Sequence, residues 1–218
     1  MSESINLKEI ERKAWRSAFQ DGLWDIYLGM LLFSMALSTM FDESTLTETW
    51  RYVIYFGFLI FSMAVLWAGK RFITTPRIGR VKFGLKGETR KRKTRLLLFA
   101  SVAFGLVAFF LTAAVYRGNF GQGLPWDVIF PLIYVLNMLV VGGLGAYFLD
   151  YPPLYLIALL FAIPLPITIL VKRTMGLEVD FYAFTIPALI IICMGLFYLA
   201  RFLREYPVVE MNHDAPQP

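Results

Sequence analysis

The chain of 218 residues is 58% hydrophobic and only 17% charged, a balance that excludes an ordinary water-soluble domain. Its net charge of +5 does not point to nucleic acid, because the basic residues flank apolar segments, where membrane orientation and anionic lipid head groups explain them. The single cysteine, Cys193, and the single histidine, His213, exclude an intrachain disulfide and a site of clustered His and Cys metal ligands. We therefore predict an all-α membrane protein without a metal or another cofactor.

The N-terminal segment, residues 1–22, has the pattern of an amphipathic helix. Leu7 and Ile10 belong to an apolar set at helical spacing, and charged residues fill the other side. Asn6 followed by Glu9 resembles a capping box at a helix start. We predict a helix that lies in the membrane interface, and the alternative is a short soluble helix packed on a cytoplasmic loop.

Apolar blocks of about 20 residues, the length of a helix that crosses a hydrocarbon core of roughly 30 Å, dominate residues 23–203. No ionisable side chain lies near the middle of any block, which argues against a proton-driven pump with a buried carboxylate. These blocks predict a polytopic bundle of six transmembrane helices. The predicted spans are Leu23–Phe41, Tyr52–Gly69, Leu96–Tyr116, Trp126–Leu149, Leu154–Val171 and Phe181–Phe202.

The fifth predicted span is interrupted by Pro164 and Pro166 near its centre. Proline removes a backbone donor and clashes with the preceding turn. Such a break is tolerated in lipid where neighbouring helices or water satisfy the freed carbonyls. We expect either a kinked helix buried against its neighbours or a re-entrant segment.

Basic residues are divided unevenly between the two sides of an alternating six-span arrangement. The loop predicted at 70–95 carries eleven Lys and Arg, and the N-terminal segment carries four. With Arg201 and Arg204, 17 of the 21 basic residues fall on one side. The other side carries Arg51, Arg117, Lys172 and Arg173. The positive-inside rule then predicts that both termini, including a polar tail at 204–218, and the basic loop are cytoplasmic.

A candidate internal repeat relates the two halves of the chain. Trp24-Asp25 opens the first span and Trp126-Asp127 opens the fourth, 102 residues later, and Lys70-Arg71 and Lys172-Arg173 show the same offset. Because three spans per half is an odd number, the halves would have opposite orientations, as in inverted-repeat transporters. The alternative is that Trp and Lys-Arg simply mark membrane interfaces.

Three polar residues of the predicted spans are candidates for a core or gate function. Asp25 and Asp127 each stand at a helix start, where a carboxylate complements the helix dipole, so capping is the plain interpretation and a pair of gates on opposite faces is the functional one. Asn137, near the centre of the fourth span, predicts an interhelical hydrogen bond or a solute contact.

The fourth span also carries a run of small residues, Gly142, Gly143, Gly145 and Ala146. Small residues let helix backbones approach closely, which predicts a packing face. Together with Asn137, this run indicates that the fourth span lies at the centre of the bundle.

The basic loop offers a candidate contact surface for lipids or for a partner protein. Alternating charged and apolar residues over Arg80 to Phe83 favour a short extended or hairpin-like element. A juxtamembrane basic cluster contributes about 1 kcal/mol per residue against an anionic leaflet. Docking of a partner protein or a phosphorylated ligand is the alternative. The candidate contacts are Arg77, Arg80, Lys82, Arg90, Lys91, Arg92 and Lys93.

Two segments of the first 85 residues carry a resemblance to known proteins. Asp21-Gly22-Leu23-Trp24-Asp25 followed by Pro76-Arg77-Ile78-Gly79-Arg80-Val81-Lys82-Phe83 resembles a group of uncharacterised small prokaryotic integral membrane proteins. The resemblance implies a prokaryotic plasma (inner) membrane and a meeting of the two segments at the cytoplasmic interface. It implies no activity.

No sequence motif supports an enzyme. A Gly-rich phosphate loop, a His-Glu-x-x-His metal motif and a Gly-x-Ser-x-Gly elbow are all missing from the sequence. We therefore expect a non-enzymatic accessory protein or scaffold that binds anionic lipids or a protein partner through its cytoplasmic basic face. The alternative is a small-solute transporter or channel built on a three-plus-three inverted repeat, and a homo-oligomer remains open in either case.

Overall fold

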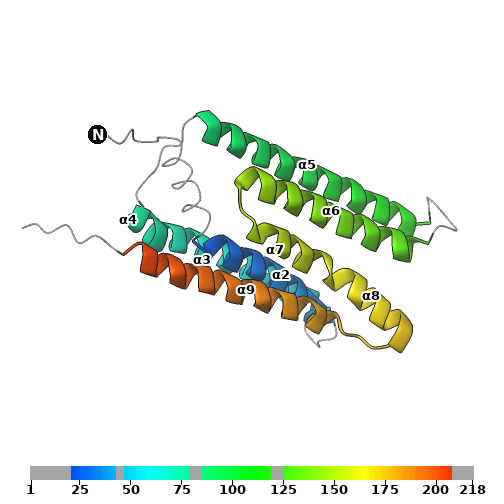
Figure 1. Ribbon diagram of the computed structural model, residues 1–218. Coiled ribbons are helices and arrows are strands. Elements are labelled where there is room, and N and C mark those ends of the chain that lie inside the picture. Colours follow the sequence, from blue (N-terminus) through cyan, green and yellow to red (C-terminus); the bar gives the residue numbers. More distant parts are fainter. Residues whose placement is uncertain (1–20, 43–46, 79–84, 119–124, 208–218) are drawn as a thin grey trace, which may run out of the picture.

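The computed structural model describes residues 21–42, 47–78, 85–118 and 125–207, and all regular secondary structure in these ranges is helical (Figure 1). The interfacial helix predicted at 1–22 and most of the tail at 204–218 lie outside them. The elements are α2 Leu23–Asp42, α3 Glu48–Gly69, the π-helix η1 Lys70–Thr74, α4 Thr75–Ile78, α5 Leu85–Tyr116, α6 Trp126–Leu149, α7 Pro153–Ala162, α8 Pro164–Met175 and α9 Asp180–Glu205.

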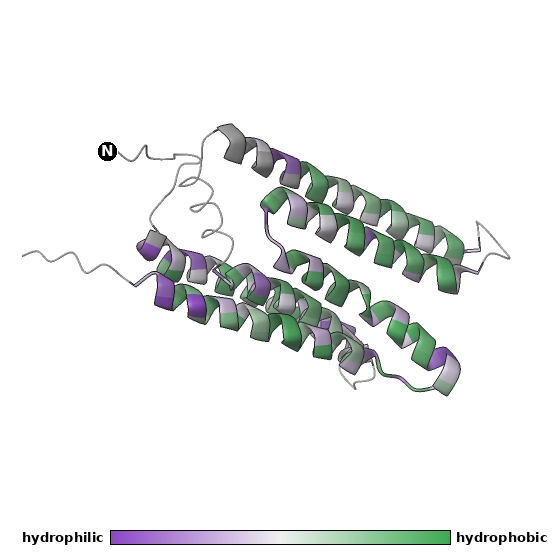
Figure 2. Cartoon of the chain, viewed as in Figure 1, coloured by the Kyte–Doolittle hydropathy of each residue, from purple (hydrophilic) through white to green (hydrophobic). Residues whose placement is uncertain are grey.

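Six helical segments among the described residues are long and apolar enough to cross a membrane, which confirms the predicted number of apolar helices. Hydrophobic residues occupy most of their length, and hydrophilic residues gather towards their ends (Figure 2). The segments are Leu23–Met40, Glu48–Arg77, Arg95–Val115, Val128–Leu149, Pro153–Met175 and Asp180–Glu205.

The structure differs from the prediction over the basic loop at 70–95. Helix α3 continues through η1 and α4 to Ile78, and α5 already begins at Leu85. The extended element predicted over Arg80 to Phe83 falls in residues 79–84, which lie outside the described residues. Charged residues ended the apolar pattern in the sequence, but Lys and Arg are good helix formers, so the helices continue beyond their apolar parts.

The fifth span is a kinked helix in two segments, α7 and α8, that follow one another in Figure 1. The bend lies at Ile163, immediately before Pro164. Beside the bend, the Tyr134 hydroxyl of α6 donates a 2.8 Å hydrogen bond to the backbone carbonyl of Phe161. A neighbouring helix therefore supplies a donor between the carbonyls of Leu160 and Ala162, which lose their N–H partners because Pro164 and Pro166 have none.

Helices α2 and α9 pack closely because small residues face one another where they cross. A Cβ atom at Gly195 would lie 2.7 Å from the backbone nitrogen of Ile26 and 2.9 Å from the carbonyl oxygen of Gly22. A Cβ at Gly29 would lie 3.0 Å from the carbonyl oxygen of Ala188. These distances leave no room for a side chain, so the glycines set the separation of the two helices.

The hydrophobic core lies where α2, α7 and α9 meet, rather than along α6 as predicted. Helix α6 packs between α5 and α7, at one side of the bundle (Figure 1). Its small residues do form the predicted packing face, since a Cβ at Gly145 would lie 3.2 Å from the side chain of Leu154. Because that face covers one side of the helix, Asn137 is only half-buried. The core residues are Leu32, Ala36, Ile157, Phe184, Ala188 and Ile191.

Candidate functional site

Two carboxylates are fully buried at the start of α2. Asp21 and Asp25 are both 0% exposed. They lie with Lys70 and Thr74 of η1 and with Tyr151 of the turn between α6 and α7. We call these five residues the Asp21–Asp25 cluster. Ionisable groups inside an apolar helical bundle are costly to bury and usually mark function, so this cluster is the first candidate site.

Asp21 uses both carboxylate oxygens. Its Oδ1 accepts a 3.2 Å hydrogen bond from the backbone N–H of Leu23, the first residue of α2. Its Oδ2 accepts bonds of 2.6 Å from the ammonium of Lys70 and 2.6 Å from the hydroxyl of Thr74. Asp21 therefore supplies the acceptor at the helix start that the sequence assigned to Asp25, and it binds η1 to α2.

Asp25 lies one helical turn further along the chain and has fewer hydrogen-bond partners than Asp21. Its Oδ2 accepts a hydrogen bond from the Tyr151 hydroxyl, whereas its Oδ1 is buried without a hydrogen-bond partner. Burial and the neighbouring Asp25 carboxylate raise the pKa of Tyr151 above its ordinary value, so this hydroxyl stays protonated and acts as the donor.

Local backbone geometry brings the members of the cluster together. Gly22 has a φ of +77°, which lets the chain turn from Asp21 into α2. Tyr151 follows a left-handed residue, Asp150, with a φ of 53°, and its N–H bonds to the carbonyl of Ala146 at 3.0 Å. This turn ends α6 and directs Tyr151 towards α2.

The π-helix η1 contributes the two donors to Asp21. Lys70 and Thr74 are its first and last residues, and the Thr75 hydroxyl donates a 2.7 Å bond to the carbonyl of Lys70. The Lys70 ammonium also lies 5.9 Å from the centre of the Trp24 ring. Short π-helical turns inside α-helices occur frequently at functional sites, and this one turns a charged and a hydroxyl side chain inward.

A second candidate site is the basic surface at the same end of the bundle. The starts of α2 and α5 lie here, together with α4 and the ends of α6 and α9 (Figure 1). Lys93 near the start of α5 lies 5.9 Å from the ring of Phe148 at the end of α6. We call this end the basic end; besides Lys70, its described basic side chains are Arg71, Arg77, Arg92, Lys93, Arg95, Arg201 and Arg204.

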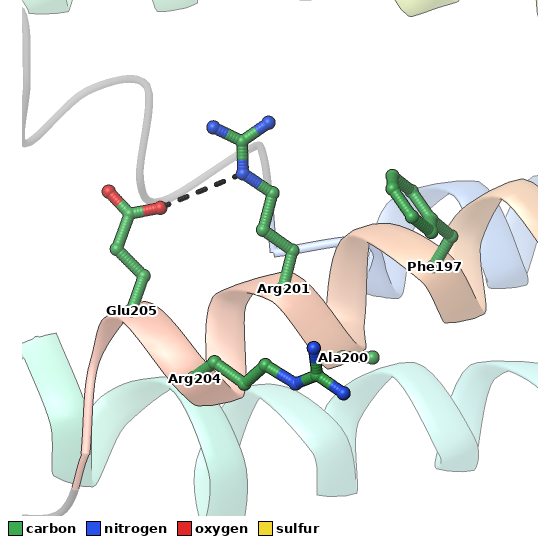
Figure 3. A pocket seen from close by; sticks show the side chains of 5 residues that line it. All are labelled: Phe197, Ala200, Arg201, Arg204 and Glu205. Carbon is green, nitrogen blue, oxygen red and sulfur yellow. Dashed lines mark ion pairs between the residues drawn. The ribbon is translucent and has the colours of Figure 1, made fainter.

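A cleft of about 460 Å³ opens on the last two turns of α9 (Figure 3). Phe197 and Ala200 form its apolar part, and Arg201, Arg204 and Glu205 form its charged part. The Arg201 guanidinium makes a loose ion pair with Glu205, at 3.9 Å between Nε and Oε2. Cationic and apolar groups therefore line the same cleft.

The structure places three of the predicted contact residues at the same end of the bundle and leaves the others undescribed. Arg77, Arg92 and Lys93 lie at the basic end, and one Arg77 nitrogen donates a 3.1 Å bond to the carbonyl of Ile73. Arg80 and Lys82 lie outside the described residues. Arg90 and Lys91 belong to α5, but their side chains also lie outside the described part.

The two predicted gate carboxylates lie at opposite ends of the bundle. Asp25 is at the basic end, whereas Asp127 is in the first turn of α6 at the far end, and its side chain is outside the described part (Figure 1). Sequence reasoning missed Asp21 and Tyr151. The signal for Asp21 was its place in the segment Asp21-Gly22-Leu23-Trp24-Asp25, just before the first residue of α2, where a carboxylate can accept from a helix-start N–H.

Comparison with protein-family models, with curated proteins and with solved structures found no match. Within the described residues, no three His, Cys, Asp or Glu side chains are grouped as they would be to hold a metal ion. The two sites above are therefore the starting points for a functional proposal.

Proposed function

We propose that the chain is a non-enzymatic multi-pass protein of the plasma (inner) membrane, with cytoplasmic termini, that binds anionic lipid head groups through its basic end. The cleft on α9 is the observation that carries this proposal. Guanidinium groups such as those of Arg201 and Arg204 match the geometry of phosphate oxygens. Phe197 and Ala200 beside them are suited to the apolar part of the same molecule. A phospholipid at the membrane surface presents both features.

The start of α5 supports the same interpretation. Arg92, Lys93 and Arg95 are exposed and immediately precede the apolar part of that helix. Each such residue contributes about 1 kcal/mol of attraction to an anionic leaflet. An acidic protein partner would use the same charges, but it would have no need of an apolar wall beside Arg201, which is why we favour lipid.

The first test compares bound lipid in wild type and in the Arg201→Gln/Arg204→Gln variant. Losing two basic contacts worth about 1 kcal/mol each should weaken binding of phosphatidylglycerol to the full-length protein by roughly ten- to thirtyfold. Native mass spectrometry of the protein in mild detergent, with titrated lipid, measures this binding. Raising the salt concentration should weaken binding to the wild type as well, because the attraction is electrostatic.

A matched control lies at the opposite end of the bundle. Lys172 and Arg173 stand in the last turn of α8, and a Lys172→Gln/Arg173→Gln variant removes the same charge. This variant should keep wild-type lipid affinity. Equal loss in both double variants, or wild-type affinity in the Arg201/Arg204 variant, would contradict a lipid site on α9.

The proposed orientation is tested by single-cysteine labelling in a Cys193→Ser background. Because 17 of 21 basic residues lie on one side of the six-span arrangement, cysteines at Thr89 and Gln217 should be protected from an impermeant thiol reagent in intact cells. Cysteines at Thr45 and Leu177 should react with it. Labelling of Thr89 from outside would reverse the orientation and remove the basic end from the anionic cytoplasmic leaflet.

A small-solute transporter with a three-plus-three inverted repeat is the second candidate. Helix α2 packs on α3 and α9, and α6 packs on α7 and α5, which are the corresponding neighbours in such a repeat. The buried Asp21–Asp25 cluster also favours it, because intramembrane ionisable groups often line ion or substrate paths. Uptake of labelled amino acids or sugars into proteoliposomes, above that of protein-free vesicles, would favour this candidate over the lipid-binding scaffold.

A further inference from the structure

The Asp21–Asp25 cluster contains two carboxylates and one ammonium group. The ammonium of Lys70 forms an ion pair with Asp21 at 2.6 Å, and the side chain of Lys70 remains 26% exposed. Asp25 is 0% exposed and accepts a hydrogen bond from a neutral hydroxyl, that of Tyr151. An ionised Asp25 would leave the buried cluster with one uncompensated negative charge, which an apolar bundle does not tolerate without a further cation.

The carboxylate oxygens that lack a hydrogen-bond partner determine which cation can supply the missing positive charge. Both oxygens of Asp21 already accept hydrogen bonds, and Oδ2 of Asp25 accepts from Tyr151. Oδ1 of Asp25 is the buried carboxylate oxygen of the cluster that lacks a partner. Hard metal ions need about six oxygen ligands, whereas a proton needs one. A single carboxylate oxygen without a partner therefore suits a proton rather than a metal ion.

Within the described part of the chain, the charged and hydroxyl groups around Asp25 come from the start of α2, from η1 and from the turn between α6 and α7. Asp21 precedes α2 and adds negative charge, Lys70 of η1 adds positive charge, and Tyr151 contributes its hydroxyl from the turn between α6 and α7. Tyr198 of α9 is close enough to Tyr151 to interact with it electrostatically. Of these groups, only the ammonium of Lys70 carries a positive charge, and it is already paired with the carboxylate of Asp21.

We propose that Asp25 is a proton-binding site of the membrane bundle, which takes up a proton on Oδ1 and exchanges it with water at the basic end. One O–H bond forms on Oδ1 when the proton arrives from water, and the same bond breaks on release. Tyr151 keeps its own proton throughout and donates to Oδ2 in both states. The Tyr151 bond is stronger to the ionised carboxylate, so proton exchange at Asp25 also changes how firmly α2 holds the turn between α6 and α7.

Difference infrared spectroscopy of the full-length protein in detergent tests this proposal. A protonated carboxylic acid has a carbonyl stretch that shifts in D2O, and the wild type should show such a band that grows as the pH is lowered through the mildly acidic range. The band should be absent from Asp25→Asn and retained in Glu178→Gln, which removes an exposed carboxyl group. Identical spectra for wild type and Asp25→Asn across the pH range from mildly acidic to mildly basic would overturn the proposal.

Two further measurements keep the outcome decisive if Asp25→Asn does not fold. Tyr151→Phe removes the donor that favours the ionised carboxylate, so the band should persist to a higher pH than in the wild type. An unchanged or lower titration midpoint in Tyr151→Phe would count against Asp25 as the proton carrier. Replacing choline chloride with sodium chloride should leave the wild-type band unchanged, and its loss on adding sodium would show that a metal ion, rather than a proton, occupies the site.

Discussion

Replacing Gly195 by alanine should lower the free energy of unfolding by about 1–3 kcal/mol, the usual cost of adding a methyl group to a filled interface. The new Cβ would lie 2.7 Å from the backbone nitrogen of Ile26 and 2.9 Å from the carbonyl oxygen of Gly22. Both neighbours are backbone atoms, which cannot rotate aside as the end of a side chain can. Helices α2 and α9 must therefore separate. Thermal unfolding in detergent, followed by circular dichroism, measures the loss.

Gly105→Ala is the matched control for this substitution. Gly105 also lies inside a long apolar helix, α5, but a Cβ there meets nothing within 4 Å. Alanine favours the helix over glycine by about 1 kcal/mol, so Gly105→Ala should be neutral or slightly stabilising. A Gly195→Ala protein as stable as the wild type would show that α2 and α9 do not rely on this close approach.

The apolar helices could be predicted from the sequence alone, because the length and composition of a membrane-spanning helix are local properties. The fourth predicted span, Trp126–Leu149, has the same bounds as α6. The break at Pro164 was also local, since proline acts on its own turn. The helical continuation through Lys70 to Ile78 was missed, because hydropathy falls where charges begin although the backbone hydrogen bonding continues.

Helix packing could not be predicted in the same way, because it depends on which surfaces meet. The glycine run of α6 was conspicuous in the sequence, and it does pack on α7 at Gly142 and Gly145. The core nevertheless formed around α2 and α9, where Gly22 and Gly195 stand at opposite ends of the chain. Nothing in either local sequence indicates that these two glycines face one another.

The Asp21–Asp25 cluster could not be predicted from the sequence either, because it also depends on which helices meet. Asp25 was identified as a carboxylate at a helix start, but its partner Tyr151 is 126 residues away. Lys70 was noticed only as the end of a span, whereas in the structure its ammonium pairs with Asp21 across 49 residues. A charge near the end of an apolar block looks solvent-accessible in a sequence, and only the neighbouring helices make it buried.

Replacing Lys70 by methionine should lower the free energy of unfolding by about 3–5 kcal/mol, the cost of removing one partner of a buried ion pair. The loss arises because Asp21 is 0% exposed and would be left without an opposite charge beside it. Adding Asp21→Asn should recover most of it, since the asparagine side chain carries no charge and its amide oxygen can still accept from the N–H of Leu23. Denaturation of the four proteins in detergent gives the coupling energy of the pair.

The exposed pair between Lys172 and Glu178 serves as the control for this cycle. Its atoms are 2.8 Å apart, close to the 2.6 Å of the Lys70–Asp21 pair, but the two side chains are 63% and 53% exposed. Water screens such a pair, so Lys172→Met should cost no more than about 1 kcal/mol. Similar losses for Lys70→Met and Lys172→Met would mean that Asp21 is not buried as the structure describes. A large loss at Lys70 that Asp21→Asn recovers would instead establish that burial, rather than distance, gives the inner pair its effect on stability.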